Sequence, residues 1–239
     1  MGKNPLKRKL TKREFMNAVF VDFEGAKTGT NTEPDYNDPN CRKFVGIMWK
    51  TNCVNLHQFI LEPSLKLCAT IYDNAEESLC EEHRVRWFST RENAERAFTD
   101  ELLKRKNRLI VSWSSHDWKI MDMMMKDGDF TEDEYSKIEE RWVDGKHIAK
   151  VWNREKLSRK VKSPHRLKDY CDLIGYDMPD GKDISTKMTY LSKVLENKRH
   201  FDDLTKSQIE KFKHICEYNF YDLEGMRAVI NKAVSQDFS

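Results

Sequence analysis

Apolar residues gather in five short segments that have the length and pattern of β-strands. These are residues 17–24, 44–49, 54–60, 109–113 and 138–143. The second and third segments are joined through Thr51 and Asn52, so we predict that they form a hairpin. Residues 27–40 carry one glycine and two prolines among polar residues and predict a loop.

Helical spacing of apolar residues becomes dominant in the second half of the chain. It is present in residues 93–106, 117–125 and 147–157, and through most of the chain from residue 185. Thr90 is a candidate cap for the first of these helices, and a further helix is predicted to open over residues 163–167 and to close at Gly175. Residues 63–90 show no clear pattern. Strands that come first, with β-α-β connections in the middle and helices later, predict an α/β domain with one mixed sheet.

Residues 19–25, with the sequence VFVDFEG, place two acids inside an apolar strand. A period of two puts Asp22 and Glu24 on one face of the strand, together with Phe20. Charge in a mostly buried strand is unfavourable unless a partner neutralises it, and carboxylate oxygens are the ligands that Mg²⁺ prefers. The segment is therefore either part of a metal site or a solvated strand end. Acids on other elements decide between the two.

Two further acids lie where an α/β protein can bring them to the same place. Asp117 shortly follows the strand predicted over 109–113, at the sheet edge where such proteins hold ligands. Alternatively, it caps the next helix. Tyr218 and Asp222 are four residues apart in a predicted helix and share one face. Alternatively, the tyrosine is a core residue and the aspartate is exposed.

In chain order, these residues resemble the three motifs of the DEDD 3′–5′ exonuclease superfamily. The motifs are Asp22-x-Glu24, Asp117 after a buried strand, and Tyr218-x-x-x-Asp222. The tyrosine variant fits, because Glu217 stands where the histidine variant carries its histidine. The resemblance covers roughly residues 17–230, most of the chain.

The third motif, Tyr-Asn-x-x-Asp, looks most like that of the predicted nucleases related to YprB. Residues 167–170 (LKDY) and Gly175 add to this resemblance. The second motif departs from the family, which usually has asparagine and phenylalanine where this chain has Ser112 and His116. The departure affects the expected substrate contacts more than metal binding, because the acid itself is present.

The resemblance implies a ribonuclease H-like fold, a mixed five-stranded sheet with helices on both sides, over residues 15–239. It implies that two Mg²⁺ or Mn²⁺ ions, about 3.5–4 Å apart, are held by four carboxylates. These are Asp22, Glu24, Asp117 and Asp222. Tyr218 is expected to orient the attacking water, since an ordinary phenol pKa of about 10 is too high for a base.

Three functions follow from this set of residues. The first is trimming of single-stranded 3′ ends of DNA or RNA. The second is endonuclease activity on the same fold, because four acids and two metal ions do not dictate end specificity. The third is a catalytically silent nucleic-acid-binding module, which the intact set of acids argues against.

The charge balance leaves a nucleic-acid partner open. The chain has 42 Lys and Arg against 40 Asp and Glu, a net charge of +2, so the distribution of charge has to decide. Basic residues cluster at 104–108 and 154–168, and form an N-terminal arm over residues 1–14 that could contact phosphates or act as a nuclear address in a eukaryote. The candidates for backbone contacts are Arg159, Lys160, Lys162 and Arg166, and those for stacking on a base are Trp113, His116 and Trp118. The alternative is a solvated surface and core tryptophans.

Cysteine spacing and apolar runs bear on the compartment. No apolar run approaches the roughly 20 residues that span a bilayer, and no secretory signal is predicted. The six widely spaced cysteines predict reduced thiols in a cytoplasmic environment. A further hypothesis is a zinc site, with Cys53, His57, Cys80 and His83 as the ligands.

Overall fold

Six strands form one mixed sheet in the computed structural model, which describes residues 7–26, 35–73, 75–113, 115–128, 130–179, 181 and 183–235. The strands are β1 (Val19–Glu24), β2 (Phe44–Lys50), β3 (Val54–Ile60), β4 (Glu82–Arg86), β5 (Ile110–Ser112) and β6 (Trp142–Asp144). The helices are α1 (Lys12–Met16), α2 (Arg91–Lys104), α3 (Ser115–Asp127), α4 (Glu132–Glu139), α5 (Gly145–Glu155), α6 (Leu167–Ile174), α7 (Ile184–Leu195) and α8 (Lys206–Ser235). Short 3₁₀ helices cover Pro39–Cys41, Pro63–Asp73, Ala75–Glu77 and Phe201–Asp203.

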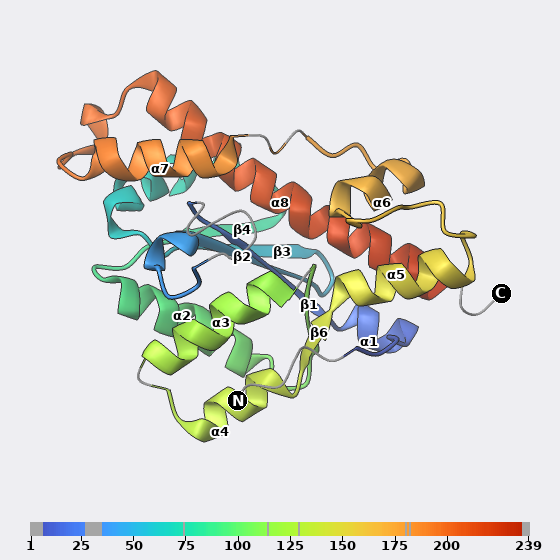
Figure 1. The fold of residues 1–239 in the computed structure, drawn as a ribbon. Coiled ribbons are helices and arrows are strands. Elements are labelled where there is room, and N and C mark those ends of the chain that lie inside the picture. The colour runs from blue at the N-terminus through green and yellow to red at the C-terminus, as the bar shows by residue number, and fades with distance from the viewer. Residues whose placement is uncertain are drawn as a thin grey trace.

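Strand β1 lies inside the sheet, whose order is β4-β3-β2-β1-β5-β6. It runs antiparallel to β2 and parallel to β5, so the carboxyl ends of β1 and β5 point the same way. Its Phe20 packs in the core that includes α5, α6 and α8, and its Val21 and Phe23 pack in the core that includes α2, α3 and α4. The long helix α8 crosses one face of the sheet, and α2 and α3 cover the other (Figure 1). Asp22 and Glu24 therefore face α8.

The sheet has one strand more than the five that the sequence predicts. The five predicted segments all contribute a strand, and the additional strand is β4, which pairs in parallel with β3 at the sheet edge. β4 lies in residues 63–90, and its sequence EHRVR carries one apolar residue, so hydrophobic periodicity could not reveal it. The strand predicted over 138–143 begins only at Trp142, because Ile138 belongs to α4.

The predicted helices are present with small shifts of their ends. Thr90 caps α2, and Gly175 ends α6 in the left-handed conformation with a φ of 74°. The helix predicted to open over residues 163–167 begins at Leu167. Asp117 is the third residue of α3, so the alternative that it is the cap of that helix is wrong.

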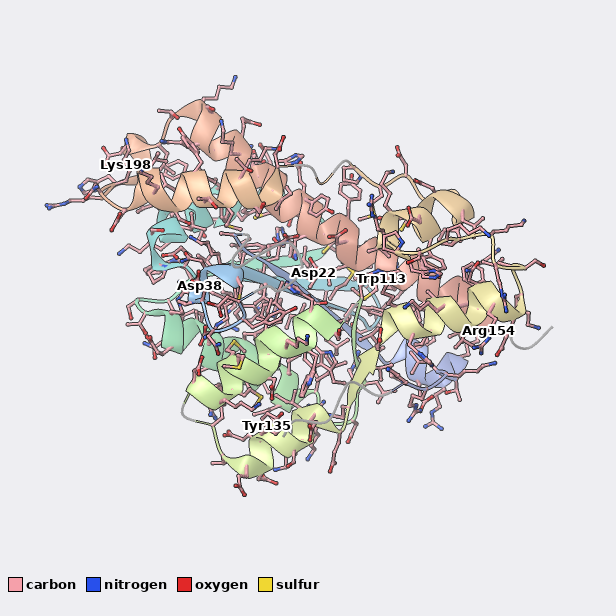
Figure 2. All side chains as sticks on the ribbon, in the orientation of Figure 1. Asp22, Asp38, Trp113, Tyr135, Arg154 and Lys198 are labelled. Atoms are coloured by element: carbon pink, nitrogen blue, oxygen red, sulfur yellow. The ribbon has the colours of Figure 1, made fainter. Side chains whose placement is uncertain are left out.

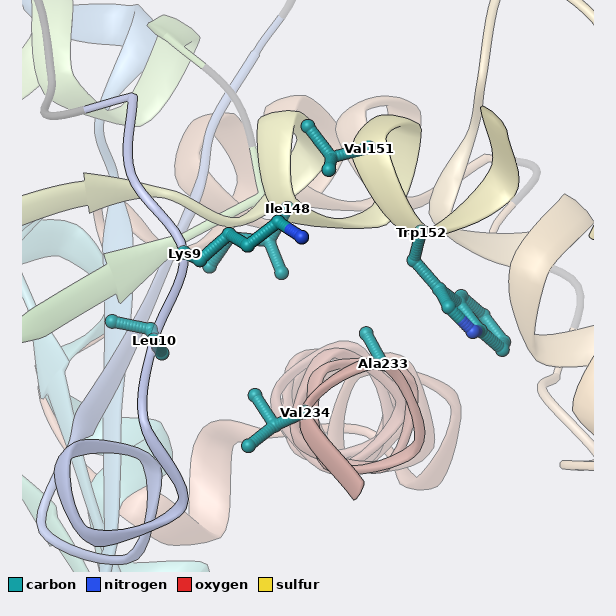
Figure 3. Close-up of a pocket in the computed structure, with 7 residues that line it drawn as sticks. All are labelled: Lys9, Leu10, Ile148, Val151, Trp152, Ala233 and Val234. Atoms are coloured by element: carbon teal, nitrogen blue, oxygen red, sulfur yellow. The ribbon is translucent and has the colours of Figure 1, made fainter. Parts of the chain in front are cut away.

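The predicted basic arm, residues 1–14, ends in packed structure. Residues 1–6 lie outside the described residues. Thr11 caps α1 through a capping box with Glu14, and Leu10 and Phe15 are buried in the core shared with α5 and α8. Figure 3 shows Leu10 at the seam between these two helices, near Ile148 and Val234. In the part of the chain that the structure describes, no helix has the length and apolar character to span a bilayer.

Candidate metal centre

Three carboxylates from opposite ends of the chain meet between the sheet and α8. One oxygen from each of Asp22, Glu24 and Asp222 lies within 4.8 Å of the others. Asp22 and Glu24 come from alternate positions of β1, and Asp222 comes from the middle of α8 (Figure 2 labels Asp22). The strand period and the packing of α8 on β1 bring them together.

The fourth predicted acid, Asp117, joins this cluster from the first turn of α3. It is 5% exposed, and the backbone N–H of Phe23 donates to its Oδ1 at 3.5 Å, a long hydrogen bond. Because Phe23 separates Asp22 from Glu24 in β1, this contact places Asp117 beside both. Its charge contributes to the raised pKa of the other three acids. The structure thus places Asp117 near the other three carboxylates, although its oxygens are not in the group that lies within 4.8 Å.

The four carboxylates repel one another in a poorly solvated place. Burial, and then the neighbouring carboxylates, raise the pKa of Asp22 and of Glu24 well above their ordinary values. Burial and the nearby Asp117 raise the pKa of Asp222 to about 7. Among the described residues, no lysine or arginine forms an ion pair with Asp22, Glu24 or Asp222. A cluster of hard oxygen donors without a cationic side chain fits a divalent cation.

We expect this repulsion to make stability depend on pH. A carboxyl whose pKa is raised by folding contributes stability that is fully present below its unfolded pKa, about 4, and is lost as the pH rises through the folded value. For Asp222 that window ends at a pKa of about 7. In EDTA, the melting temperature should therefore fall as the pH rises through this window, and Mg²⁺ or Mn²⁺ should restore it.

The matched comparison for this prediction is the Asp222→Asn protein, since its amide does not ionise. Its melting temperature should depend less on pH across the same window and should gain less from the metal ion. Thermal unfolding with EDTA or with Mn²⁺ measures both effects. Identical pH profiles for the two proteins would show that the acids do not repel one another as described.

Tyr218 lies one helical turn before Asp222, and its phenol is close enough to the Asp222 carboxylate to lower the pKa of that group, against the effect of burial. Burial and the charges of the acids raise the pKa of Tyr218 further, so its phenol stays protonated and acts as a donor rather than a base. Gly181 packs against the phenol: a Cβ there would lie 2.2 Å from the Tyr218 hydroxyl oxygen. The backbone at Gly181 therefore limits where this hydroxyl can lie.

Asn219, for which the sequence predicts no role, holds Asp22. It is fully buried, and its Nδ2 donates to Oδ2 of Asp22 at 2.8 Å and to the Asp22 backbone carbonyl at 3.1 Å. The strand residue opposite Asp22 is Gly46, and a Cβ there would lie 2.0 Å from Oδ1 of Asn219. A glycine inside an apolar strand often marks a place where another group comes close to the backbone. Gly46 is therefore the sequence feature that could have indicated the contact with Asn219.

The two stacking candidates beside Asp117 are already engaged within the protein. Trp113 is partly buried and packs edge-to-face on Tyr170, with ring centres 5.6 Å apart. His116 shares a hydrogen bond of 3.1 Å between its Nδ1 and the hydroxyl of Tyr36, a residue for which the sequence predicts no role. Asp117 contributes to the raised pKa of Tyr36, which places this phenol near the acids. Trp118 is a core residue, packed on Trp142.

Ser112, at the position where the family usually has asparagine, has a structural role. It is fully buried in β5, and its hydroxyl accepts a hydrogen bond from Nε1 of Trp142 at 2.9 Å. This bond joins β5 to the edge strand β6. The hydroxyl is therefore not available to a ligand at the protein surface.

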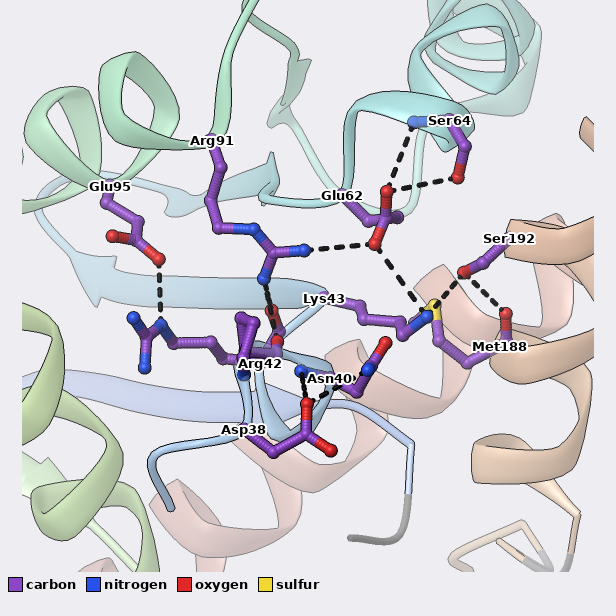
Figure 4. A network of polar contacts seen from close by, with 11 residues as sticks. Asp38, Asn40, Arg42, Lys43, Glu62, Ser64, Arg91, Glu95, Met188 and Ser192 are labelled. Atoms are coloured by element: carbon purple, nitrogen blue, oxygen red, sulfur yellow. Dashed lines mark hydrogen bonds and ion pairs between the residues drawn. The ribbon is translucent and has the colours of Figure 1, made fainter. Parts of the chain in front are cut away.

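A network of ion pairs and hydrogen bonds surrounds the segment that pairs with the end of β1 at Glu24 (Figure 4). The backbone N–H of Lys43 donates to the Glu24 carbonyl at 2.8 Å. Arg91 donates to the carbonyls of Pro39 and Arg42 and pairs with Glu62 at 3.0 Å. These contacts fasten the segment that enters β2 and so fix the end of β1 where two of the acids lie.

The four basic candidates of the second cluster lie on the loop between α5 and α6. Arg159, Lys160, Lys162 and Arg166 are all exposed, and within the described residues none of them pairs with an acid. Asn153 anchors the loop by two hydrogen bonds to the backbone of the buried Val161, at 2.8 and 3.0 Å. Lys160, Lys162 and Arg166 line an open hollow of about 640 Å³. The loop thus presents unpaired positive charge on a fixed backbone.

The first basic cluster, residues 104–108, lies at the opposite end of the strands. It precedes β5, whose amino end adjoins the amino end of β1, whereas the acids lie at the carboxyl end of β1. Arg105 pairs with Glu101 at 2.6 Å and stacks on Trp49, so it stabilises the fold. This cluster is not placed to contact a substrate at the acids.

The residues of the zinc hypothesis do not converge. Within the described part of the chain, Asp22, Glu24 and Asp222 form the only group of three or more potential ligands whose atoms lie together. His57 pairs with Arg84 across β3 and β4, so it points to the face opposite that of His83. The zinc hypothesis is therefore wrong for this structure. All six cysteines are free.

The chain was also compared with known proteins. No protein family model, curated protein or solved structure matched it. Any assignment of function therefore rests on the residues and geometry of the site.

Proposed function

We propose that this chain is a metal-dependent 3′–5′ exonuclease that hydrolyses phosphodiester bonds of single-stranded DNA or RNA. One observation carries the proposal. Three segments that lie far apart in the sequence converge on one place, β1 with Asp22 and Glu24, α3 with Asp117, and α8 with Tyr218 and Asp222. These are the residues through which the sequence resembles the tyrosine-type DEDD exonucleases, and any one of them alone would mean little.

The residues present fit two Mg²⁺ or Mn²⁺ ions. Asp22, Glu24 and Asp222 would hold them, with Asp117 completing the set of hard oxygen ligands. Divalent cations bound there would neutralise the carboxylates, activate water and stabilise negative charge on a phosphate group. The raised pKa values of the acids support this proposal, because a bound cation would offset the repulsion that raises them.

The protein's own groups would prepare the site. Tyr218, protonated and held by Gly181, offers a hydroxyl beside Asp222 that can orient a water molecule. Asn219 holds Oδ2 of Asp22 and so restricts rotation of this carboxylate. Tyr218 and Asn219 both extend from helix α8, and Asn219 is fully buried, so a regular element of the core presents both groups, as a preorganised site requires.

The sheet supports the ribonuclease H-like assignment. Strands β3, β2, β1, β5 and β6 are neighbours in one mixed sheet with helices on both faces, which is the architecture that the resemblance implies. The sixth strand, β4, extends the sheet beyond β3, away from the acids on β1. It alters an edge and leaves the arrangement around β1 intact.

An assay with defined ends tests the proposal. Single-stranded DNA and RNA that carry a 5′ label should be shortened stepwise from the 3′ end in Mn²⁺, and EDTA should stop the reaction. A blocked 3′ end and a circular strand should resist. Cleavage of the circle would favour the endonuclease, and binding without cleavage in any metal ion would favour the silent module.

The basic loop provides a prediction about substrate binding. Replacing Arg159, Lys160 and Lys162 by Ala should weaken binding of single-stranded nucleic acid and lower the slope of log K against log salt by about 3, since each lost phosphate contact removes ~1. Fluorescence anisotropy over a salt series measures the slope. The control replaces Lys104, Lys106 and Lys137, three exposed lysines away from the acids, and should leave the slope unchanged. Equal slopes in the two variants would mean that the loop is only a solvated surface.

A further inference from the structure

A row of hydrogen bonds crosses the sheet and ends on Asp22. Gly46 of β2 is paired with both Asp22 of β1 and Gln58 of β3, so the three residues form a line across three strands. Because Gly46 has no side chain, the amide of Asn219 from α8 fits between the other two. Nε2 of Gln58 donates to Oδ1 of Asn219 at 3.1 Å, and Nδ2 of Asn219 donates to Asp22.

The row begins at His83 on β4. Nε2 of His83 lies 2.9 Å from Oε1 of Gln58, and the backbone N–H of Leu79 donates to Nδ1 of His83 at 3.3 Å. An N–H group can only donate, so Nδ1 is the acceptor and Nε2 carries the proton. Burial and the nearby His57 lower the pKa of His83 to about 4, so the ring is neutral at physiological pH.

Backbone groups fix the direction of every bond in the row. The carbonyl of Cys216 accepts from Nε2 of Gln58 at 2.9 Å, and the carbonyl of Asp22 accepts from Nδ2 of Asn219 at 3.1 Å. Carbonyls only accept, so neither amide can turn over without placing an oxygen against an oxygen. Each donor therefore points toward Asp22, from Leu79 through His83, Gln58 and Asn219.

We propose that His83 and Gln58 are positioning residues, which act through Asn219 to hold the Asp22 carboxylate in its metal-binding orientation. The inference rests on the proposed function for the identity of the ligand. Buried polar groups are nearly always hydrogen-bonded, so a row of hydrogen bonds alone would not indicate a function. This row ends on a carboxylate of the acid cluster, and partners of that kind orient metal ligands. Its bonds to Oδ2 and to the backbone carbonyl of Asp22 oppose rotation of the carboxylate away from Glu24 and Asp222.

Mn²⁺ affinity, measured by electron paramagnetic resonance without any nucleic acid, tests this role. Asn219→Ala should weaken Mn²⁺ binding about 10- to 100-fold, and Gln58→Met about 10-fold, which is the range for partners that orient metal ligands. The double variant should bind no more weakly than Asn219→Ala alone, because Gln58 acts through Asn219. Additive losses would overturn this connection.

Two histidines on adjacent strands give a matched pair of further variants. His83→Phe removes the donor to Gln58 and should weaken Mn²⁺ binding, whereas His83→Gln keeps a donor and should retain most of the affinity. His57 points to the opposite face, so His57→Phe should leave the affinity unchanged. Melting temperatures identify variants that lose binding only because they unfold.

The outcomes separate this inference from the proposed function. Folded Gln58→Met and His83→Phe proteins with the wild-type Mn²⁺ affinity would overturn the inference, as would an equal loss in His57→Phe or a wild-type protein that binds no Mn²⁺. A wild-type protein that binds Mn²⁺ through the row but cleaves no nucleic acid would contradict the exonuclease and leave the positioning role standing.

Discussion

Replacing Asp222 by Asn should lower nuclease activity about 1000-fold or more, because it removes a charge that would hold the metal ion beside the reacting phosphate. The fold should survive, since asparagine has nearly the shape of aspartate and keeps an oxygen beside the Tyr218 hydroxyl. In EDTA the variant should even be more stable, by about 1–3 kcal/mol or roughly 2–10 °C in Tm near pH 8. The gain arises because the raised pKa of Asp222 reflects repulsion that the amide does not feel.

Activity and thermal unfolding in EDTA and in Mn²⁺ measure these two opposite effects. Asp100 on α2 offers a control, since it forms an exposed ion pair with Arg96. Asp100→Asn should change stability by less than about 0.5 kcal/mol and leave activity intact. An Asp222→Asn protein that is both fully active and no more stable than the wild type would remove Asp222 from the site.

Tyr218→Phe should reduce turnover by roughly 10- to 1000-fold with little change in binding, the range for a group that positions a proton or a water molecule. The substitution keeps the ring that packs on Gly181 and removes only the hydroxyl that lies beside Asp222. Steady-state kinetics separate turnover from binding. Melting temperature must be followed as well, because a buried acceptor left without its donor lowers stability.

Two companion variants sharpen the Tyr218 result. Gly181→Ala retains the hydroxyl but places a methyl group against the end of the phenol, so it should reproduce part of the loss by moving the hydroxyl. Tyr190 on α7 is 43% exposed, and Tyr190→Phe should have no effect. A stable, metal-binding and fully active Tyr218→Phe protein would favour the endonuclease over the tyrosine-type exonuclease.

Much of the fold, and the acids of the site, could be predicted from the local periodicity of the sequence. Asp22 and Glu24 could be assigned to one strand face because the side-chain period of a strand is two, and Tyr218 and Asp222 to one helix face because they are four residues apart. Strand β4 and helix α1 could not be found in this way. The first is mostly charged and lies at an edge, and the second is a single short turn of helix among basic residues.

The residues that support the acids needed the tertiary structure. Gln58 reads as an ordinary polar residue of a hairpin strand, and its role depends on its pairing with Gly46 and on α8 crossing at that point. The sequence offers His83 as a zinc ligand only as a hypothesis, and in the structure its ring nitrogens are hydrogen-bonded to Leu79 and Gln58. Pairing between distant strands decides these contacts, and no local pattern encodes it.

Mn²⁺ binding to the wild-type and Asp22→Asn proteins is the sharpest test of the proposed metal centre. Asp22 lies among the other acids and is the carboxylate that Asn219 holds. If the four carboxylates form a two-metal site, the wild-type protein should bind about two Mn²⁺ ions, and Asp22→Asn should lose at least one of them while remaining folded. Equal Mn²⁺ binding by the two folded proteins, or none by the wild type, would contradict a metal centre built on these acids.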